Sequence, residues 1–395
     1  MCDVVSGRMS SHDRSRVSAV KHASPGRAFL VAAGPAGIDA ATAAGEAYAR
    51  IAQTLHRGGL EIVHERVFGS LSAQPAVMAA RCEALRSAGI DPDGPITYLQ
   101  GRPPWGEGFA GAIIHAVSSA ARETNVRVLT DGERPCGRAW QSDGITFIVL
   151  QDIRGLENAG TDNSPASQAR RAMERADRLL RANGASYRNT VRTWFYLSDI
   201  LAWYPEFNRA RNTMYGEFNL LPEDGRPPTL PASTGIRADH PGGAACALDL
   251  LAAVAPDADE PAVRFLRNPQ QQDAFRYGSA FSRCAVVRGP RETLIELSGT
   301  AAIDEAGNSL YPGDIRSQVC ATLEKVAVLL AQTGASLQHI CAATVFVKNG
   351  ADADAARAVM ADAGLAELPA VWVVADVCRD ELLFEIDAEA SLPSV

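Results

Sequence analysis

The chain has 395 residues, of which 47% are hydrophobic and 21% charged, and its formal net charge is −8. The length predicts two or three domains, and the composition excludes a disordered or collagen-like chain. An acidic chain without Lys/Arg clusters is not expected to bind nucleic acid. No apolar run approaches the roughly 18–20 residues of a membrane span, so we expect no membrane role.

Residues 1–26 lack the apolar core of a signal peptide and are interpreted as a flexible extension. The 8 cysteines are scattered, without a CxxC pair or a His/Cys cluster. We therefore expect no metal site and no disulfide framework, and we expect reduced thiols in the cytoplasm. Only 3 residues are Lys, which leaves Arg as nearly the only cation for an anionic ligand.

The first predicted unit begins after this extension. Its pattern indicates, in order, a strand at 29–34, a helix over 40–57, a strand at 60–70, a helix over 72–87, and strands at 95–101 and 111–120. This unit resembles the two that follow in the order of its elements. Its residues are hardly identical to theirs.

The second and third units share a visible repeat. SQARRAMERADRLLRANGAS (167–186) aligns without a gap with SQVCATLEKVAVLLAQTGAS (317–336). Each segment has apolar residues at helical spacing and ends at a glycine suited to a helix C-terminus. Each is followed by a β-rich run (190–199 and 340–349) and by a second helical segment (200–216 and 351–364). The alternative is chance similarity between amphipathic helices.

Further strands flank these helices. Strand pairs precede the first helix, at 137–141 and 145–153 in the second unit and at 281–287 and 293–303 in the third. At the end of each unit we expect 228–234 to pair with 245–254, and 370–377 with 381–390. These patterns predict an α/β (α+β type) fold of three β-β-α-β-α-β domains in a pseudo-three-fold arrangement. The predicted domains cover residues 27–125, 126–258 and 259–395.

Aromatic and basic residues gather on one face of the predicted helix 200–216. Tyr204, Phe207, Arg211 and Tyr215 are spaced to share that face. Arg211 in such surroundings suits a bidentate grip on a carboxylate. The alternative is an Arg that pairs with a neighbouring acid while the aromatic rings pack.

The strand before this helix presents a similar choice. Arg192, Trp194 and Tyr196 share one of its faces by two-residue alternation. Arg192 and Tyr196 could supply another cation and another donor to a ligand, or they could lie on a solvent-facing strand edge.

Glu385 lies among Leu382, Leu383, Phe384 and Ile386 in a predicted strand. Burial there would raise its pKa and keep part of it protonated near neutrality, as a general acid requires. The alternative is a Glu on the exposed face of the strand. Cys378, seven residues upstream, is either inert packing or part of the same site.

Several runs in the chain resemble the chorismatases. They are CGRAW (136–140), RTWFYLSDILAWYPEFNRAR (192–211), LPASTGI (230–236), ACALDL (245–250), YGSAFSR (277–283), LSGTAAID (297–304) and VCRDELLFEIDA (377–388). The resemblance spans residues 27–392. It implies three domains of the YjgF-like deaminase fold and a cofactor-free enzyme that splits chorismate.

The resemblance also implies a site between the central and C-terminal domains. Glu385 would protonate the methylene carbon of the chorismate enol ether, an oxygen nucleophile would trap the resulting cation, and pyruvate would leave. Tyr204 and Arg211 match the family best among the substrate-binding residues. Other substrate-binding residues in matching runs are Arg192, Tyr215, Tyr277, Arg283 and Gly299.

Gly299 and Cys378 match the branch of the family that forms 3-hydroxybenzoate. The other branches hydrolyse chorismate to a dihydroxycyclohexadiene carboxylate or form 4-hydroxybenzoate. The resemblance therefore favours a catalytic site with Glu385 and Cys378, and 3-hydroxybenzoate with pyruvate as products.

Two other classes of function stay open. A YjgF-like imine or enamine deaminase would share the fold, and a non-catalytic ligand-binding protein would share the pocket. We expect a monomer, because three internal repeats would satisfy within one chain the interface that a trimer makes between chains.

Overall fold

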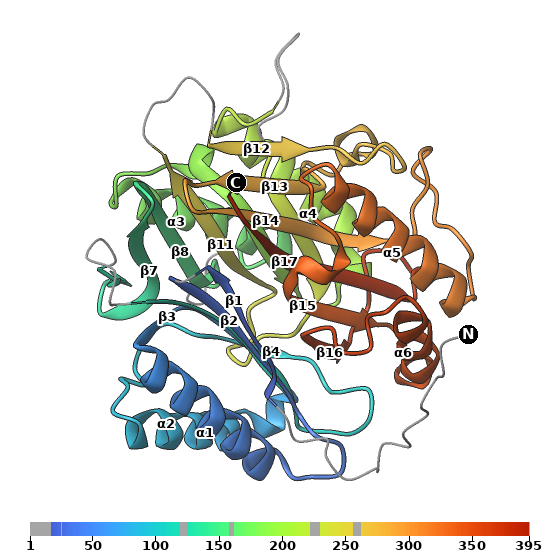
Figure 1. Cartoon of the computed structure of the whole chain (residues 1–395). Helices are drawn as coiled ribbons and strands as arrows, with labels where there is room; N and C mark the ends of the chain where they lie inside the picture. Colours follow the sequence, from blue (N-terminus) through green and yellow to red (C-terminus); the bar gives the residue numbers. More distant parts are fainter. Residues whose placement is uncertain are drawn as a thin grey trace.

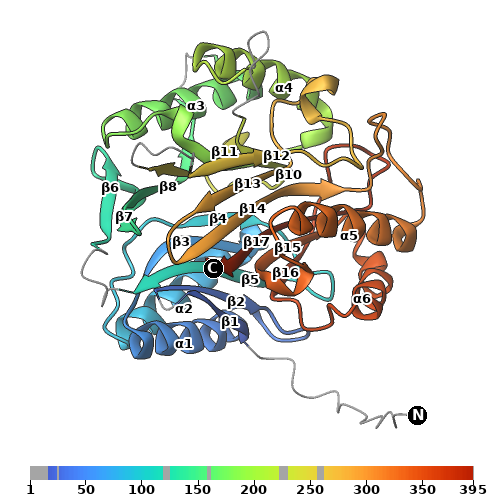
Figure 2. The ribbon, with the colours of Figure 1, turned by 45° about the horizontal axis from the view of Figure 1, so that its top comes forward.

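The computed structural model describes residues 17–24, 26–118, 125–157, 162–221, 230–255 and 262–394. These residues form three sheets arranged around a common centre, with helices on the outside (Figures 1 and 2). The fold is therefore the predicted α/β arrangement of three similar units. The predicted domain boundary at residue 258 lies outside the described residues, the one at residue 125 lies at the start of a described segment, and both stay predictions.

The first sheet has the strand order β1-β2-β5-β3-β4. Its elements are β1 (Val17–Ser24), β2 (Arg27–Ala33), α1 (Ala40–Gly58), β3 (Leu60–Gly69), α2 (Gln74–Ser87), β4 (Thr97–Gln100) and β5 (Phe109–Ser118). β1 falls within residues 1–26, which the sequence assigns to a flexible extension. In the structure residues 17–24 instead pair antiparallel with β2, while residues 1–16 lie outside the described residues.

The second sheet has the order β10-β9-β11-β8-β7-β6, and the third has the order β12-β13-β14-β17-β15-β16. The second unit contains β6 (Arg127–Asp131), β7 (Arg134–Ser142), β8 (Ile145–Arg154), α3 (Pro165–Arg181), β9 (Thr190–Leu197), α4 (Ile200–Glu217), β10 (Ala232–Arg237) and β11 (Cys246–Val254). The third contains β12 (Val263–Leu266), β13 (Cys284–Arg288), β14 (Glu292–Ala301), α5 (Ile315–Ala331), β15 (Ile340–Val347), α6 (Ala353–Asp362), β16 (Ala370–Val374) and β17 (Phe384–Pro393). β6 and β12 are edge strands that the sequence pattern does not predict.

The expected pairing of the last two strands in these units is wrong. β10 pairs in parallel with β9, and β16 pairs in parallel with β15. A helix crosses over between the two strands of each pair, as parallel strands require. The final strand of each unit then lies on the other side, between β9 and β8 or between β15 and β14. Neighbours in the sequence are therefore not neighbours in the sheet here.

Three backbone hydrogen bonds link the units in a closed ring. Gln100 N donates to Asp239 O (3.0 Å), Arg237 N to Asp376 O (3.1 Å), and Val374 N to Arg102 O (3.0 Å). The donors belong to the ends of β4, β10 and β16, which are the same strand of each unit. The ring therefore shows which residues of the three units occupy equivalent positions in the pseudo-three-fold arrangement.

The inner faces of the sheets meet in a buried apolar cluster from all three units, and several polar pairs are buried beside it. Buried ion pairs or hydrogen bonds there join different units: Arg27–Glu292 (2.5 Å), Arg66–Glu389 (2.9 Å) and His64–Asp249 (3.0 Å). Apolar side chains fill the layers between each sheet and its helices. Losing one partner of a buried pair costs about 3–5 kcal/mol, so these pairs favour one relative placement of the units.

Candidate active site

A cavity of about 400 Å³ lies between the second and third units. This size is within the range of about 300–1,000 Å³ that is typical of small-molecule sites. Its walls come from α4 and β10 of the second unit, and from β14, β17 and the segments before β13 and after β16 of the third. The sequence resemblance places a site between the same two units.

Glu385 on β17 lines this cavity, although its side chain is only 4% exposed. Burial raises the pKa of its carboxyl to about 8, and the nearby Asp387 adds to the rise. The cations Arg192 and Arg283 act in the opposite direction but do not outweigh burial. The expectation that Glu385 is buried is therefore confirmed, and the raised pKa is the direction that a general acid requires.

Gly299 on β14 leaves the space that the Glu385 carboxyl occupies. A Cβ atom at residue 299 would collide with Glu385 Oε1 and approach Thr234 Cγ2 to 3.3 Å. The amide of Gly299 donates to Thr234 Oγ1 (3.1 Å) across the boundary between the units. The glycine is needed here because the carboxyl lies directly against the backbone.

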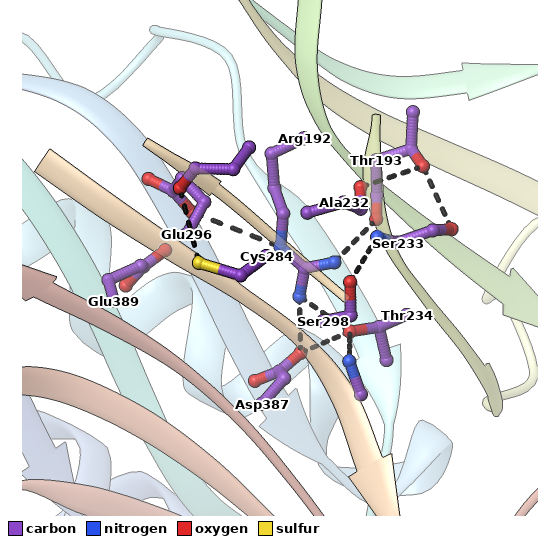
Figure 3. Close-up of polar contacts among 12 residues, drawn as sticks. Arg192, Thr193, Ala232, Ser233, Thr234, Cys284, Glu296, Ser298, Asp387 and Glu389 are labelled. Atoms are coloured by element: carbon purple, nitrogen blue, oxygen red, sulfur yellow. Dashed lines mark hydrogen bonds and ion pairs between the residues drawn. The ribbon is translucent and has the colours of Figure 1, made fainter. Parts of the chain in front are cut away.

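Thr234, which accepts from the Gly299 amide, belongs to a polar network with Arg192 and Asp387 (Figure 3). Arg192 Nη2 donates to Thr234 Oγ1 (2.5 Å), and Thr234 Oγ1 contacts Asp387 Oδ2 at 3.0 Å. Arg192 Nη2 is also 3.4 Å from Asp387 Oδ2. Arg192 is fully buried in this network and does not line the cavity. Its contribution to a ligand would therefore pass through the residues in front of it.

Two guanidinium groups flank the ring of Phe281 at the cavity wall. The Cζ atoms of Arg211 and Arg283 lie 5.5 Å and 5.1 Å from the ring centroid. Arg211 Nη2 donates to Asn208 Oδ1 (2.7 Å), and Arg283 Nη2 donates to Tyr277 Oη (2.7 Å). The Nε atoms of both arginines are buried without a hydrogen-bond partner among the described residues. Buried cations with donors to spare suit an anionic ligand.

Tyr204 reaches the cavity because α4 is interrupted near its start. Trp203 departs from helical geometry (φ −144°, ψ 16°), and Pro205 follows two residues later. Proline suits the first turn of the helical segment that continues from there. Tyr204 and Cys378 both line the cavity, and burial raises the pKa of the Cys378 thiol to about 12, with the charge of Glu385 contributing.

Of the residues that the sequence nominates for a ligand or for catalysis, all but Arg192, Tyr196 and Tyr215 line the cavity. Tyr196 is buried in the apolar cluster between the sheets. Tyr215 is fully buried beside Tyr187, with ring centroids 5.5 Å apart, in the layer between α4 and the second sheet. It shares a helix face with Arg211, but a face more than three turns long exceeds the reach of one cavity.

Other lining residues escaped the sequence reasoning. They are Pro205, Asn208, Arg209, Asn212, Ser233, Gly235, Gly278, Ser279, Phe281, Ala301, Ile303 and Arg379. Several lie inside the runs that carry the family resemblance, which is the signal that could have found them. Gly235 lies in one of these runs (230–236), but its residue type indicates no role, because its contribution is the space it leaves.

No group of three or more His, Cys, Asp or Glu side chains in the described parts of the chain is arranged to hold a metal ion. Within the same residues, no helix has both the length and the apolar character to cross a membrane.

Comparisons with known proteins find chorismatases and proteins of the L-PSP and YjgF type. A chorismatase from Streptomyces hygroscopicus is 28% identical over 272 residues, which are 64% of this chain and 73% of that protein. A crystal structure of a chorismatase superposes with a TM-score of 0.59 at 19% identity, covering 83% of this chain and 92% of that one. The family model for Endoribonuclease L-PSP matches residues 272–392.

A smaller solved structure, a member of the YjgF family from Neisseria meningitidis, covers 34% of this chain and 97% of its own, at 20% identity and a TM-score of 0.26. The resemblance to the chorismatases that the sequence predicts is confirmed by the curated relative, the shared three-domain fold and the L-PSP match.

Proposed function

We propose that this chain is a chorismatase that converts chorismate to 3-hydroxybenzoate and pyruvate. The observation that carries the proposal is Glu385, a buried carboxyl with a pKa raised to about 8 on the wall of a cavity lined by Tyr and Arg. A pKa near the working pH is what a general acid needs. The chorismatase relative supplies the substrate class.

In the proposed reaction Glu385 protonates the methylene carbon of the enol ether. The positive charge that develops at the adjacent ether carbon is trapped by the ring's own hydroxyl, which loses its proton and forms a cyclic ketal. The bond between that hydroxyl oxygen and the ring carbon then breaks as the neighbouring ring carbon loses its proton, which makes the ring aromatic. The second C–O bond of the former ketal carbon breaks last, which releases pyruvate and leaves the original ether oxygen on the ring as the phenol. One chorismate yields one pyruvate and one hydroxybenzoate, so no oxidant or reductant is consumed. The carboxylate left on Glu385 recovers its proton from solvent or from the aromatising ring.

The substrate is a dianion, and the cavity offers matching cations. Arg211 and Arg283 present unused donors beside Phe281, and Tyr204 and Tyr277 add hydroxyl groups. We assign the two arginines to the carboxylates, because bidentate pairing fixes the orientation of a planar acid group. Orientation matters because the methylene carbon must lie within about 3–3.5 Å of the Glu385 carboxyl oxygen that carries the proton.

The product branch is proposed from Gly299 and Cys378. Gly299 lies against the Glu385 carboxyl, and Cys378 lines the same cavity close enough for the charge of Glu385 to raise its pKa. A larger residue at either position would move the ring or the acid relative to each other. We propose that these small residues let the ring's own hydroxyl reach the cation before water does. Water as the nucleophile would give the non-aromatic diene diol instead.

The test is incubation of the purified protein with chorismate in the presence of a chelator, followed by chromatography of the products. Equimolar pyruvate and 3-hydroxybenzoate are expected. Pyruvate with 4-hydroxybenzoate or a diene diol would keep Glu385 as the acid and overturn the role given to Gly299 and Cys378. Unchanged chorismate together with turnover of 2-aminoacrylate would replace the proposal by an imine deaminase.

We further propose that the chain works as a monomer in the cytoplasm. The ring of hydrogen bonds between Gln100, Arg237 and Val374 and their acceptors supports the monomer, because one chain supplies all three units. Light scattering of the purified protein should give a mass near 41.9 kDa. A mass of three chains would contradict it.

A further inference from the structure

Three equivalent positions in the pseudo-three-fold arrangement carry very different side chains. The ring of hydrogen bonds makes Gln100, Arg237 and Val374 equivalent. Two residues earlier on the same strands lie Tyr98, Gly235 and Trp372. Each of the three is paired in parallel with the equivalent residue of its neighbouring strand, Val67, Phe195 and Val345 respectively.

Aromatic rings fill this position in the first and third units. Tyr98 is 5% exposed and donates from its hydroxyl to Ser70 O (2.8 Å). The ring of Trp372 lies 5.5 Å from the ring of Trp105, which comes from the first unit. Arg357 of α6 covers Trp105, with its Cζ 3.8 Å from the ring centroid. An aromatic side chain at this position therefore fills space beside the strand in both units.

In the second unit the same position is Gly235, and the space in front of it belongs to the cavity. A Cβ at residue 235 would point at Tyr204, 3.5 Å from its Cε2 and 3.9 Å from its hydroxyl. Those are ordinary contact distances, so a methyl group fits there. A larger side chain has only the cavity to enter.

We propose that Gly235 is the residue that keeps this one cleft open, and that it sets the size of ligand that reaches Glu385. The inference uses the equivalence of the three strands and the direction of the missing side chain. Its consequence for substrate choice rests on the function proposed above, while its consequence for access to the cavity does not.

The test is a series of substitutions of increasing size: Gly235→Ala, Gly235→Val and Gly235→Trp. Because an aromatic residue already occupies the equivalent place twice, we expect the Trp variant to fold, with a circular dichroism spectrum like that of the wild type. The KM for chorismate should rise by less than about threefold for Ala and by about tenfold or more for Val, with kcat changing less than KM. The Trp variant should show no turnover.

A second measurement follows access to the cavity without a substrate. Cys378 lines the cavity, whereas Cys320 is exposed on α5. Because the raised pKa of Cys378 leaves little thiolate near neutral pH, alkylation by iodoacetamide is measured at about pH 9.5 and quantified at each cysteine by peptide mass spectrometry. It should slow at Cys378 by about tenfold or more in Gly235→Trp. The rate at Cys320 should not change. Gly106→Trp is the matched control, because no atom lies within 4 Å of a Cβ at residue 106.

The outcomes separate the two proposals. A folded Gly235→Trp variant with wild-type alkylation of Cys378 and wild-type turnover would overturn the role of Gly235. Wild-type protein that leaves chorismate untouched would instead overturn the proposed function, and the alkylation rates would still decide whether Gly235 opens the cleft. Should the Trp variant not fold, unchanged KM values for both Ala and Val would overturn the proposal.

Discussion

The cleft between the second and third units differs from its counterpart between the third and first. Glu385 lies opposite Phe346 in the third sheet, and the equivalent residue opposite Phe68 in the first sheet is Gly111. A Cβ at residue 111 would clash with the carbonyl of Ala32 and with the side chain of Val371. The counterpart therefore has no acid at this place, and β16 closes over it.

The same position in the second sheet is Ala247, opposite Tyr196. The three repeats thus provide one scaffold, and single positions decide what each cleft can do. Two positions distinguish this cleft. The third unit has Glu385 where the first and second units have Gly111 and Ala247. The second unit has Gly235 where the first and third units have Tyr98 and Trp372. This asymmetry teaches that function after repetition depends on few residues, because the backbone is already shared.

The sharpest way to break the comparison is to remove the acid. Glu385→Gln should lower kcat by about 10²–10⁴-fold, because proton transfer to the substrate is lost while the shape of the side chain is kept. The measurement is steady-state release of pyruvate from chorismate, with binding checked by calorimetry. Glu381→Gln, at an exposed acid just before β17, is the matched control and should keep full activity. Near-normal kcat in Glu385→Gln would exclude this residue as the acid.

The same substitution should stabilise the fold at neutral pH. The pKa of Glu385 is raised from 4.5 to about 8 in the folded chain, so the wild type loses stability as the pH rises through this interval. At pH 7 we expect Glu385→Gln to be more stable by roughly 3 kcal/mol, and at pH 4 by almost nothing.

Urea unfolding of both proteins at the two pH values measures this difference. An equal gap at both pH values would mean that the carboxyl ionises as freely in the folded chain as in the unfolded one.

A methyl group on Gly299 should separate catalysis from folding. Gly299→Ala forces the Glu385 carboxyl away from its place, and a displacement of about 1 Å can cost about 10²-fold in rate. We expect kcat to fall about 10–100-fold while the melting temperature changes little, since the atom that must move is at the end of a side chain.

Gly111→Ala is the matched variant in the counterpart cleft. Its Cβ meets the backbone of Ala32, which cannot give way cheaply. We expect a loss of about 1–3 kcal/mol in the free energy of unfolding with kcat unchanged in the folded fraction. A fall in kcat for Gly111→Ala, or none for Gly299→Ala, would remove the distinction between the two clefts.

The smallest expected effect concerns the products. Cys378→Val fills space beside Glu385 and should change the ratio of 3-hydroxybenzoate to diene diol more than the total consumption of chorismate, which we expect to vary by less than about threefold. Chromatography of the reaction at fixed conversion gives the ratio. A constant ratio would remove Cys378 from the account of product choice.

Much of the fold was predictable from the sequence. The helices of all three units follow from apolar periodicity and terminal glycines, and the repeat at 167–186 and 317–336 sets the second and third units in register. The order of the strands was not predictable from the same pattern, because period and hydrophobicity say that a strand is buried but not which strand lies beside it. The wrong pairing of β10 with β11 shows this limit.

Some residues of the candidate site could also be predicted from the sequence, and others could not. Glu385 stood out because a charged residue in a run of Leu, Phe and Ile needs a reason, and Arg211 because aromatic residues surround it. Tyr215 shared the pattern of Arg211 but lies in the layer beneath, because periodicity assigns a face and not a depth along it. Gly235 and Gly299 act through the side chain they lack, which no local pattern reveals.

The sequence by itself determined the three repeated units, their helices and the presence of one unusual buried carboxyl. It could do so because burial and backbone geometry leave a local periodic record along the chain. Only the tertiary structure decided that α4 and β10 of one unit face β14 and β17 of the next, that Arg192 lies behind the cavity, and that the cavity beside Glu385 lies between the second and third units. Those outcomes depend on contacts between residues far apart in the chain, where the fit of side chains, and not their type, is what matters.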